Sequence, residues 1–224
     1  MKIVSAGPAF YDSADSLNNE FKDDYSNSII ILGAIYFSAL FSAMKKNKLP
    51  SLHDKYDKVI VFNQEQLHST QRNFLTPEYI EWIKQADEVW DYDETNFDLL
   101  YKFNKNIKLH LLKPYKNWST YPIYKKDIDI LFYGLMNEHR KKLLDHLGKK
   151  YKVVICNGVY RNDLDNYILR SKILLNIHYY YECSLQEQAR MIRWIGSPCR
   201  IISEKSVKNY LGVKELTYEE LYNL

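Results

Sequence analysis

Short apolar runs alternate with helix-length stretches along most of this chain, and that alternation restricts its fold more than any other feature. The clearest run is KVIVFN at 58–63, whose continuous apolar character is expected of a buried parallel strand. Strands that alternate with helices favour parallel sheets flanked by helices, so the chain is predicted to be an α/β protein. Strands are predicted at 2–6, 58–63, 88–92, 107–112, 128–134, 151–155, 173–178 and 200–203.

Helices are predicted in most of the stretches between these strands. Pro77 in a first turn and Gly148 at a last turn are the punctuation expected of two of them. The most apolar stretch, 28–44, is about 17 residues long, which is short for a membrane span, and is interpreted as a buried helix. No membrane span is therefore expected, and 9–27 is predicted to be polar and irregular. Helices are predicted at 29–44, 76–86, 95–104, 137–148, 163–170 and 185–195, with two more at the end of the chain.

The strand–helix pattern occurs twice, with a proline-rich and aromatic joint at 114–122 between the two occurrences. This predicts two doubly wound, Rossmann-like units, an N-terminal one at 1–120 and a C-terminal one at 121–224. A chain of 224 residues has room for two such small domains. Ligands of doubly wound sheets bind beyond the carboxyl ends of the strands, so polar residues at predicted strand ends are the candidates for a site.

Charge and cysteine usage narrow the classes of function. Residues 1–120 hold 14 Lys/Arg against 16 Asp/Glu, whereas residues 121–224 hold 17 against 12. The second half therefore favours an anionic ligand, although a face that follows a DNA backbone is usually more basic. The three cysteines have no CxxC spacing, which argues against a disulfide framework and against a zinc site. Without a signal peptide, the expected location is the cytoplasm, or the host cytoplasm for a viral protein.

In the second half, a glycine and the start of a helix follow the strand at 128–134. Gly134 lets a ligand approach the backbone closely, and Asn137 and Arg140 stand in the first turn of the next helix. A helix N-terminus favours phosphate, and an arginine adds a bidentate donor. A plain turn followed by a solvated helix start is an alternative that the spacing allows equally well.

Three more sets of candidates follow in this half. Asn176 and His178 lie two apart at the end of a strand and so share a face. Glu187 and Arg190 share a helix face, where the carboxylate could accept ribose hydroxyls and the arginine could pair with it or reach phosphate. A surface ion pair is the alternative. The turn formed by Asn157, Gly158, Val159 and Tyr160 could hold a nucleobase, or be a turn and nothing more.

In the first half, polar residues follow two neighbouring strands. The strand at 58–63 continues into Gln64, Glu65 and Gln66, and Glu65 could be a general base. Asp91, Asp93 and Asn96 follow the next strand, and helix caps or solvated loops are the alternatives. The chain contains no GxGxxG loop, P-loop, HExxH or GxSxG motif. No metal site is expected, since the DxD spacing of Asp91 and Asp93 is a bare match.

Several strings together resemble one enzyme group. They are VFNQEQL (61–67), EVWDYDETN (88–96), DIDILFYGLMNEHR (127–140), NGVY (157–160), SKILLNIHYY (171–180), EQARM (187–191) and RIISE (200–204). They are similar to bacterial, phage and giant-virus glycosyltransferases of the GT-B type, near the CgeB-like spore-coat group. The resemblance covers roughly 58–205, and its more specific part begins at residue 127.

This resemblance implies two Rossmann-like units that face a cleft, in a compact GT-B-like arrangement. It implies a nucleoside diphosphate sugar as substrate, UDP-linked and bound mainly by the second unit, with no cofactor and no metal. Gly134, Asn137 and Arg140 would lie at the phosphates, Asn157–Tyr160 at the base, Glu187 on the ribose with Arg190 beside it, and Ser171, Lys172 and His178 along the cleft. Asn63, Gln66 and Asn96 would contact the acceptor, and Glu65 would be the catalytic base.

The leading hypothesis is therefore a glycosyltransferase acting on a hydroxyl of a glycan or of an unidentified acceptor. One alternative is a phage-type DNA glycosyltransferase that transfers a glucosyl or arabinosyl group to a hydroxylated base such as hydroxymethylcytosine. A second is a nucleotide-binding module without catalysis, which the short first unit favours. A hydrolase or epimerase on the same fold is a third.

Overall fold

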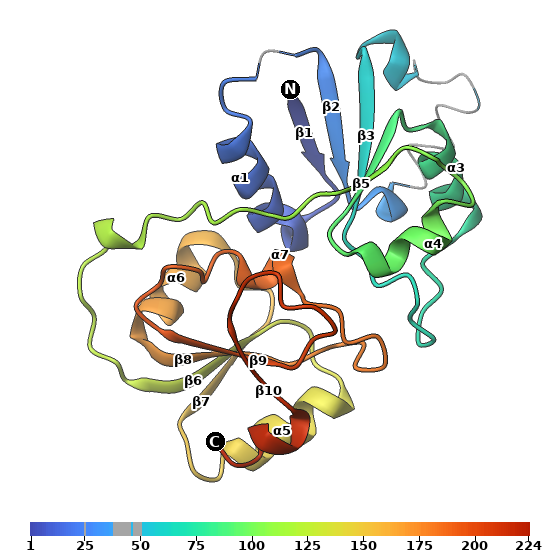
Figure 1. The fold of residues 1–224 in the computed structure, drawn as a ribbon. Coiled ribbons are helices and arrows are strands. Elements are labelled where there is room, and N and C mark those ends of the chain that lie inside the picture. Colours follow the sequence, from blue (N-terminus) through green and yellow to red (C-terminus); the bar gives the residue numbers. More distant parts are fainter. Residues whose placement is uncertain (25, 38–45, 47–50) are drawn as a thin grey trace. The chain divides into compact units, whose positions relative to one another are not determined.

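The computed structural model describes residues 1–24, 26–37, 46 and 51–224, and the chain forms two compact units (Figure 1). The first unit is Met1–Lys113 and the second is Pro114–Leu224. Each contains one parallel sheet of five described strands, which confirms the α/β prediction. In the described part of the chain, no helix is long and apolar enough to cross a membrane.

The first unit has strands that follow one another across the sheet in chain order. The order is β1-β2-β3-β4-β5, and all described pairs are parallel. This order does not reverse within the described strands, so it lacks the reversal that the doubly wound prediction implies. Its strands are β1 (Lys2–Ser5), β2 (Ser28–Leu32), β3 (Lys58–Asn63), β4 (Glu88–Asp91) and β5 (Ile107–Leu109), and its α-helices are α1 (Tyr11–Glu20), α3 (Pro77–Gln85) and α4 (Phe97–Leu100).

Two predictions for the first unit are wrong. The stretch expected to begin a buried helix at residue 29 forms β2 instead, whose SIIIL sequence is buried and rich in β-branched side chains that favour strands. The later part of that predicted helix, at 38–44, lies outside the described residues. The stretch predicted to be irregular contains α1, whose buried face includes Ser13 and Ser16. Because that face is polar, hydropathy could not reveal the helix.

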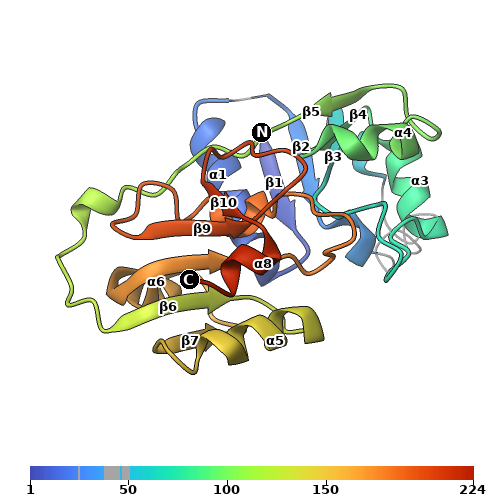
Figure 2. The same ribbon diagram turned by 60° about the horizontal axis from the view of Figure 1, so that its bottom comes forward.

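The second unit is doubly wound, as predicted. Its strand order is β10-β9-β8-β6-β7, so the order reverses at the pair β6 and β8. One core on Leu131 includes Leu164 and Ile168 of α6, and another on Phe132 includes Leu143 of α5, so these helices cover opposite faces of the sheet (Figure 2). The elements are β6 (Ile128–Tyr133), α5 (Glu138–Leu147), β7 (Val153–Cys156), α6 (Arg161–Arg170), β8 (Ser171–Asn176), α7 (Gln188–Met191), β9 (Arg200–Glu204), β10 (Lys214–Leu216) and α8 (Tyr218–Leu221).

The end of the chain differs from the prediction of two helical segments. It forms β10, which pairs with β9 in parallel, and then the four-residue helix α8. The helix predicted at 185–195 is only the four residues of α7. Both differences are in short elements, where tertiary pairing decides the conformation more than local propensity does.

The boundary between the units lies before the predicted one at residue 120, because the aromatic joint packs on the second unit. Trp118 is buried, and its Nε1 donates to the carbonyl oxygen of Arg193 over 2.9 Å. Lys116 Nζ lies 2.6 Å from a carboxylate oxygen of Asp165, which also pairs with the Arg193 side chain over 2.7 Å. Residues 114–120 therefore belong to the second unit.

Candidate functional site

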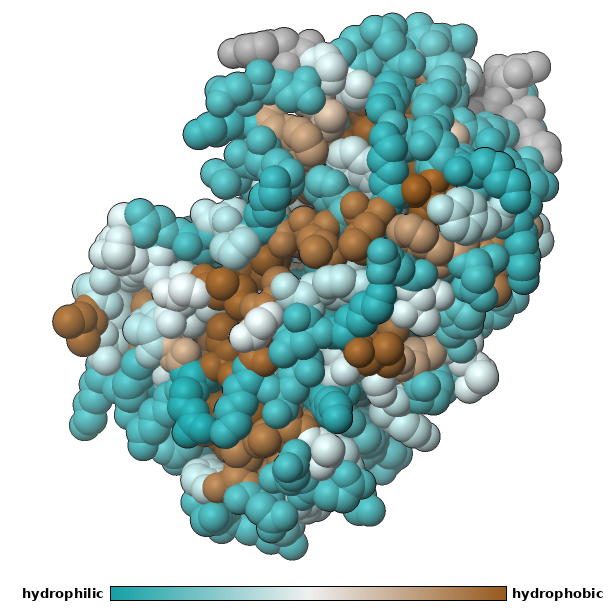
Figure 3. Space-filling view, in the orientation of Figure 1, coloured by the Kyte–Doolittle hydropathy of each residue, from teal (hydrophilic) through white to brown (hydrophobic). Residues whose placement is uncertain are grey.

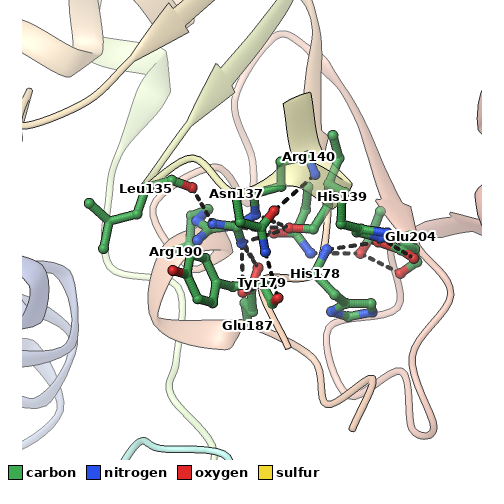
Figure 4. A network of polar contacts seen from close by, with 12 residues as sticks. Leu135, Asn137, His139, Arg140, His178, Tyr179, Glu187, Arg190 and Glu204 are labelled. Carbon is green, nitrogen blue, oxygen red and sulfur yellow. Dashed lines mark hydrogen bonds and ion pairs between the residues drawn. The ribbon is translucent and has the colours of Figure 1, made fainter. Parts of the chain in front are cut away.

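In the second unit, the reversal of strand order places the carboxyl ends of β6 and β8 side by side. Gly134 follows β6 directly, and Ile177 and His178 follow β8. Parallel sheets bind ligands at such a reversal, outside the carboxyl ends of the strands. Arg140, Glu187 and Arg190 meet at this point in one network of polar contacts (Figure 4).

Arg140 is fully buried, and its guanidinium is occupied by protein acceptors. Nε and Nη2 donate to the carbonyl oxygen of Ile177 over 2.9 and 2.7 Å, and Nη1 donates to that of Leu135 over 2.7 Å. Nη2 also donates to Glu187 over 2.8 Å. Through these contacts Arg140 links α5 to the end of β8 and to Glu187. They do not support its predicted role at the donor phosphates.

Glu187 lies between two arginines and has no acceptor capacity left. One carboxylate oxygen accepts from Arg140 and from the Tyr179 N–H over 2.8 and 3.2 Å, and the other accepts from Arg140 and Arg190 over 3.1 and 2.5 Å. Burial alone would raise the pKa of Glu187, but Arg190 and Arg140 outweigh burial and hold the pKa below its usual value. The predicted contact with ribose hydroxyls is therefore not supported, because every lone pair is already used.

Arg190 presents one edge of its guanidinium without a partner among the described residues. Its Nη1 donates to Asn176 Oδ1 over 2.9 Å and to Glu187, whereas neither Nε nor Nη2 has a hydrogen bond to any described group. The side chain is 15% exposed. A free guanidinium edge at this depth is a donor pair for an anion.

The charges of the network leave one positive charge uncompensated. The guanidinium groups of Arg140 and Arg190 face the single carboxylate of Glu187. The pKa of Arg140 is lowered to about 10, first by burial and then by the nearby charge of Arg190, while Glu187 offsets part of this lowering. Buried ions are stable when paired, so an anionic ligand would complete the set.

Asn137 begins α5 beside this network. Its Oδ1 accepts from the Arg140 N–H over 2.9 Å, and its Nδ2 donates to the Tyr179 carbonyl oxygen over 2.8 Å. The side chain is thus the N-cap of α5, a structural role that its predicted contact with phosphate did not include. The N-terminus of this helix still adds a favourable dipole for an anion.

His178 and Glu204 form a second, deeper set of contacts. Glu204 accepts from the His178 N–H over 2.8 Å and lies 3.0 Å from Nε2 of His139, whose ring is stacked on Tyr218. His178 is fully buried, with Nε2 3.2 Å from the Lys205 carbonyl oxygen. Its Nδ1 has no partner among the described residues. His178 therefore lies near the network, as Figure 4 shows, but inside the protein.

Ser171 and Lys172 lie at the other edge of the sheet, so the prediction that they share a site with Gly134 is wrong. They are the first two residues of β8, whose carboxyl end carries the network. Ser171 Oγ donates to the Tyr167 carbonyl oxygen over 2.6 Å, and Lys172 pairs with Asp129 over 2.7 Å. β8 begins directly after α6 ends at Arg170, two residues before the predicted start at residue 173, so Ser171 and Lys172 lie at its amino end.

The turn after β7 lies at the same carboxyl edge as Gly134. Asn157 and Gly158 are exposed, whereas Val159 and Tyr160 pack against the core on the α6 face. The Tyr160 ring meets that of Tyr133 edge to face, with centroids 6.3 Å apart. Tyr160 thus packs on the protein itself, which does not support its predicted contact with a nucleobase.

The exposed surface near the network includes apolar side chains. Leu135 is 63% exposed, and its side chain points away from the network in Figure 4. Tyr181 is 51% exposed and stacks on His139. Figure 3 shows that the visible face is mostly hydrophilic with scattered apolar areas.

In the first unit, the predicted acceptor residues form a buried network instead of an open surface. Asn63 and Asn96 are 1% and 0% exposed, and both donate to the carboxylate of Asp91 at the end of β4. Burial raises the pKa of Asp91 to about 8, against the opposing effect of its three hydrogen-bond donors. A direct contact between these asparagines and an acceptor is thus not supported.

Glu65 is the half-buried member of this set. Its Oε1 accepts from the Tyr36 hydroxyl over 3.1 Å, and no described group bonds to its Oε2. Burial raises the pKa of Glu65 to about 7, although Tyr36 and Arg72 lower it in part. Gln66 is 4% exposed, and its Oε1 has no partner among the described residues. A carboxyl group that titrates near neutrality suits a general base.

Sequence reasoning missed Tyr36 and Tyr79, which donate to Glu65 and Asn63 across 29 and 16 residues of chain. No periodicity connects residues at such separations, so only the fold could reveal them. In the described part of the chain, no three His, Cys, Asp or Glu side chains form a group suited to a metal ion.

Comparisons with known proteins do not assign the chain to a family. No protein-family model matches it, and no curated protein matches it as a relative. The geometry of each unit and the resemblance of the sequence strings remain as the indications of function.

Proposed function

We propose that the protein is a glycosyltransferase, and that its second unit binds a nucleoside diphosphate sugar at the carboxyl ends of β6 and β8. The observation that carries the proposal is the unpaired guanidinium edge of Arg190 in a network with one excess positive charge. A diphosphate is an anion of the right shape for that edge, since its oxygens accept two parallel N–H bonds.

The surroundings of Arg190 suit a diphosphate. Gly134 has a φ of 141°, and a Cβ built there would lie 2.8 Å from Arg190 Nη2. The absence of a side chain at Gly134 therefore leaves room for the Arg190 guanidinium, which lies against the backbone there. The N-terminus of α5 lies beside it and contributes a favourable dipole.

The first unit supports the catalytic half of the proposal. The carboxylate of Glu65 takes the proton from a hydroxyl group of the acceptor, while the oxygen of that hydroxyl forms a bond to the anomeric carbon of the sugar. The bond from that carbon to the diphosphate breaks, and the nucleoside diphosphate leaves with the electron pair. A pKa near 7 places Glu65 close to the optimum for such a base at neutral pH. The acceptor in this proposal is a glycan or another hydroxyl compound.

A thermal-shift screen against nucleoside diphosphate sugars, with and without EDTA, tests the proposal. A ligand that binds only the native state raises the free energy of unfolding by about 2.7 kcal/mol when its concentration is a hundred times Kd. We expect a clear rise in Tm with at least one UDP- or GDP-linked sugar that EDTA does not abolish, followed by sugar transfer when acceptors are added. Binding without transfer to any acceptor would favour the nucleotide-binding module, and no rise with any donor would contradict the proposal.

A further inference from the structure

Three hydrogen bonds with two buried amide side chains hold the backbone N–H and carbonyl oxygen of Glu65. Asn63 Nδ2 donates to the Glu65 carbonyl oxygen over 2.9 Å, and the Glu65 N–H donates to Asn63 Oδ1 over 3.3 Å. Asn96 Nδ2, from the turn after β4, donates to the same carbonyl oxygen over 3.1 Å. Restraint of both the N–H and the carbonyl group fixes the direction in which the Glu65 side chain leaves the backbone.

Both amides are fully used within the protein. The second Nδ2 hydrogen of Asn63 is donated to Asp91 over 2.8 Å, and its Oδ1 accepts from the Tyr79 hydroxyl over 2.7 Å. Asn96 donates its second hydrogen to Asp91 over 3.1 Å and accepts from the Leu67 N–H over 3.1 Å. An amide offers two donor hydrogens, so neither side chain has a donor left for a ligand.

Asp91 joins the two asparagines. Its two carboxylate oxygens accept from Asn63 and from Asn96, and one also accepts from the Asp93 N–H over 2.9 Å. Asp91 and Asn96 are both 0% exposed. A buried polar network whose members are satisfied in this way is rigid, because any displacement leaves a polar group without a partner.

We propose that Asn63 and Asn96 are positioning residues, which act through the backbone of Glu65 and hold its carboxyl group where it accepts a proton from a hydroxyl ligand. The inference rests on the proposed function, in which Glu65 is the base. Tyr36 occupies one carboxylate oxygen, and the other oxygen has no described partner, so it is the one that would face the ligand. The two asparagines touch no ligand themselves.

The positioning has a measurable consequence for the titration of Glu65. In the part of the chain that the structure describes, the titratable and charged groups around it are Tyr36, Arg72, Tyr79 and Asp91. Burial is the main cause of its raised pKa. If the backbone anchors are removed, the carboxyl group gains water, and its pKa falls toward the ordinary value of 4.5.

The test is an NMR titration of the full chain labelled with ¹³C at the glutamate carboxyl carbon, with the Glu65 signal assigned from Glu65→Gln. We expect the pKa of Glu65, about 7 in the wild-type protein, to fall by about one unit or more in Asn96→Ala. The milder Tyr79→Phe removes only the hydroxyl that donates to Asn63, so it should fold and shift the pKa by less in the same direction.

Asn104→Ala is the matched control in the same unit. Asn104 Nδ2 also donates to two backbone carbonyl oxygens, those of Ile83 and Ala86, each over 2.8 Å, but it does not contact Glu65. We expect this variant to lower Tm without moving the pKa of Glu65. If Asn96→Ala and Tyr79→Phe also leave that pKa unchanged, the asparagines are structural only and the inference is overturned.

The titration does not require sugar transfer, so its result is separate from that of the donor screen. A shift of the Glu65 titration together with an unaffected transfer rate in Glu65→Gln would mean that the positioning exists but that Glu65 is not the base. No shift, together with donor-dependent transfer, would remove the positioning role and leave the proposed function standing.

Discussion

The guanidinium of Arg190 lies where a side chain on residue 134 would have to be. A Cβ built on Gly134 would lie 2.8 Å from Nη2 of Arg190 and 3.0 Å from its Cζ. Real Cβ atoms essentially never make contacts below 3.0 Å, so a side chain at residue 134 would force the Arg190 guanidinium to shift. This bare backbone and the arginine next to it are the part of the second unit that we assign to the diphosphate.

Gly134→Ala should weaken donor binding more than it weakens the fold. The new methyl group must displace the Arg190 side chain, and the φ of 141° is strained for alanine. We expect a loss of roughly 1–3 kcal/mol of stability, with at least a tenfold loss of affinity for a nucleoside diphosphate, measured by calorimetry.

Gly212→Ala is the control for backbone strain alone. Gly212 also has a positive φ, 62°, but a Cβ there would meet nothing within 4 Å. It should lose a similar amount of stability and keep its affinity. Equal affinities of the two variants would show that the conflict with Arg190 is irrelevant to binding.

Arg140→Ala and Glu187→Ala should destabilise the protein strongly. Either change leaves buried charges or carbonyl groups without their partners, since Arg140 is fully buried and Glu187 is 14% exposed. Breaking a buried ion pair from one side costs about 3–5 kcal/mol. Chemical denaturation of both variants measures this, and Arg170→Ala, which breaks an exposed pair with Asp127, should change stability far less. Wild-type stability in Glu187→Ala would mean that the network of Arg140, Glu187 and Arg190 does not form.

The sequence alone suggested that these two residues are exposed and bind a ligand or form a surface pair. Their positions after β8 and at the start of α5 were predicted correctly enough for them to meet, but their burial could not be read from spacing. The spacing of three positions from Glu187 to Arg190 fits a surface pair as well as a buried one. In the structure, Arg140 donates to the carbonyl oxygen of Ile177 and Arg190 donates to Asn176. Both partners come from the end of β8, and sequence spacing could not reveal these contacts.

Glu187 should also make stability depend on pH in the acid range. Its folded pKa lies below the ordinary 4.5, so the folded state binds fewer protons than the unfolded state near that pH. The stability it contributes is fully present above pH 4.5 and is lost as the pH falls through the folded pKa. Urea denaturation between pH 3 and 6 gives the free energy of unfolding at each pH. This free energy should change less steeply with pH in Glu187→Gln than in the wild type, whereas equal slopes would contradict the ionised network of Arg140, Glu187 and Arg190.

Trp118→Phe should weaken the second unit only. The change removes the N–H that bonds to the Arg193 carbonyl oxygen, which costs about 1–3 kcal/mol when the acceptor stays buried. Hydrogen exchange should accelerate in β6 and β8. Trp90→Phe, which removes a 2.9 Å bond to Glu88, should instead accelerate exchange in β3 and β4. Faster exchange in the first unit of Trp118→Phe would assign the joint to both units.

Strands with uniform apolar runs could be predicted, because their sequences fit no other buried element of that length. KVIVFN is β3 with the predicted bounds, and IDILFY is β6. The prediction for 28–44 failed for the opposite reason, since a mostly apolar stretch of 17 residues fits a helix as well as a strand and its continuation. The β-branched Ile29–Ile31 was the signal that favoured a strand.

The candidate site was predictable in place and not in role. Strand ends indicated Gly134, Asn137 and Glu65, and the structure puts each at the carboxyl edge of its own sheet. Ser171 and Lys172 lie at the amino edge of the sheet, where the strand predicted at 173–178 already put them, and only the resemblance had placed them at the site. The roles of Asn63 and Asn96 depend on Asp91 and Tyr79, contacts that only folding creates.

Calorimetric titration of Arg190→Ala with the donor from the thermal-shift screen tests the central claim most directly. Charge-assisted hydrogen bonds contribute about 1.5–3 kcal/mol, so the variant should bind at least about tenfold more weakly than the wild type. Arg170→Ala removes the same charge at the amino edge of the same sheet and should bind as the wild type does. Wild-type affinity in Arg190→Ala would contradict the assignment of the diphosphate to this site.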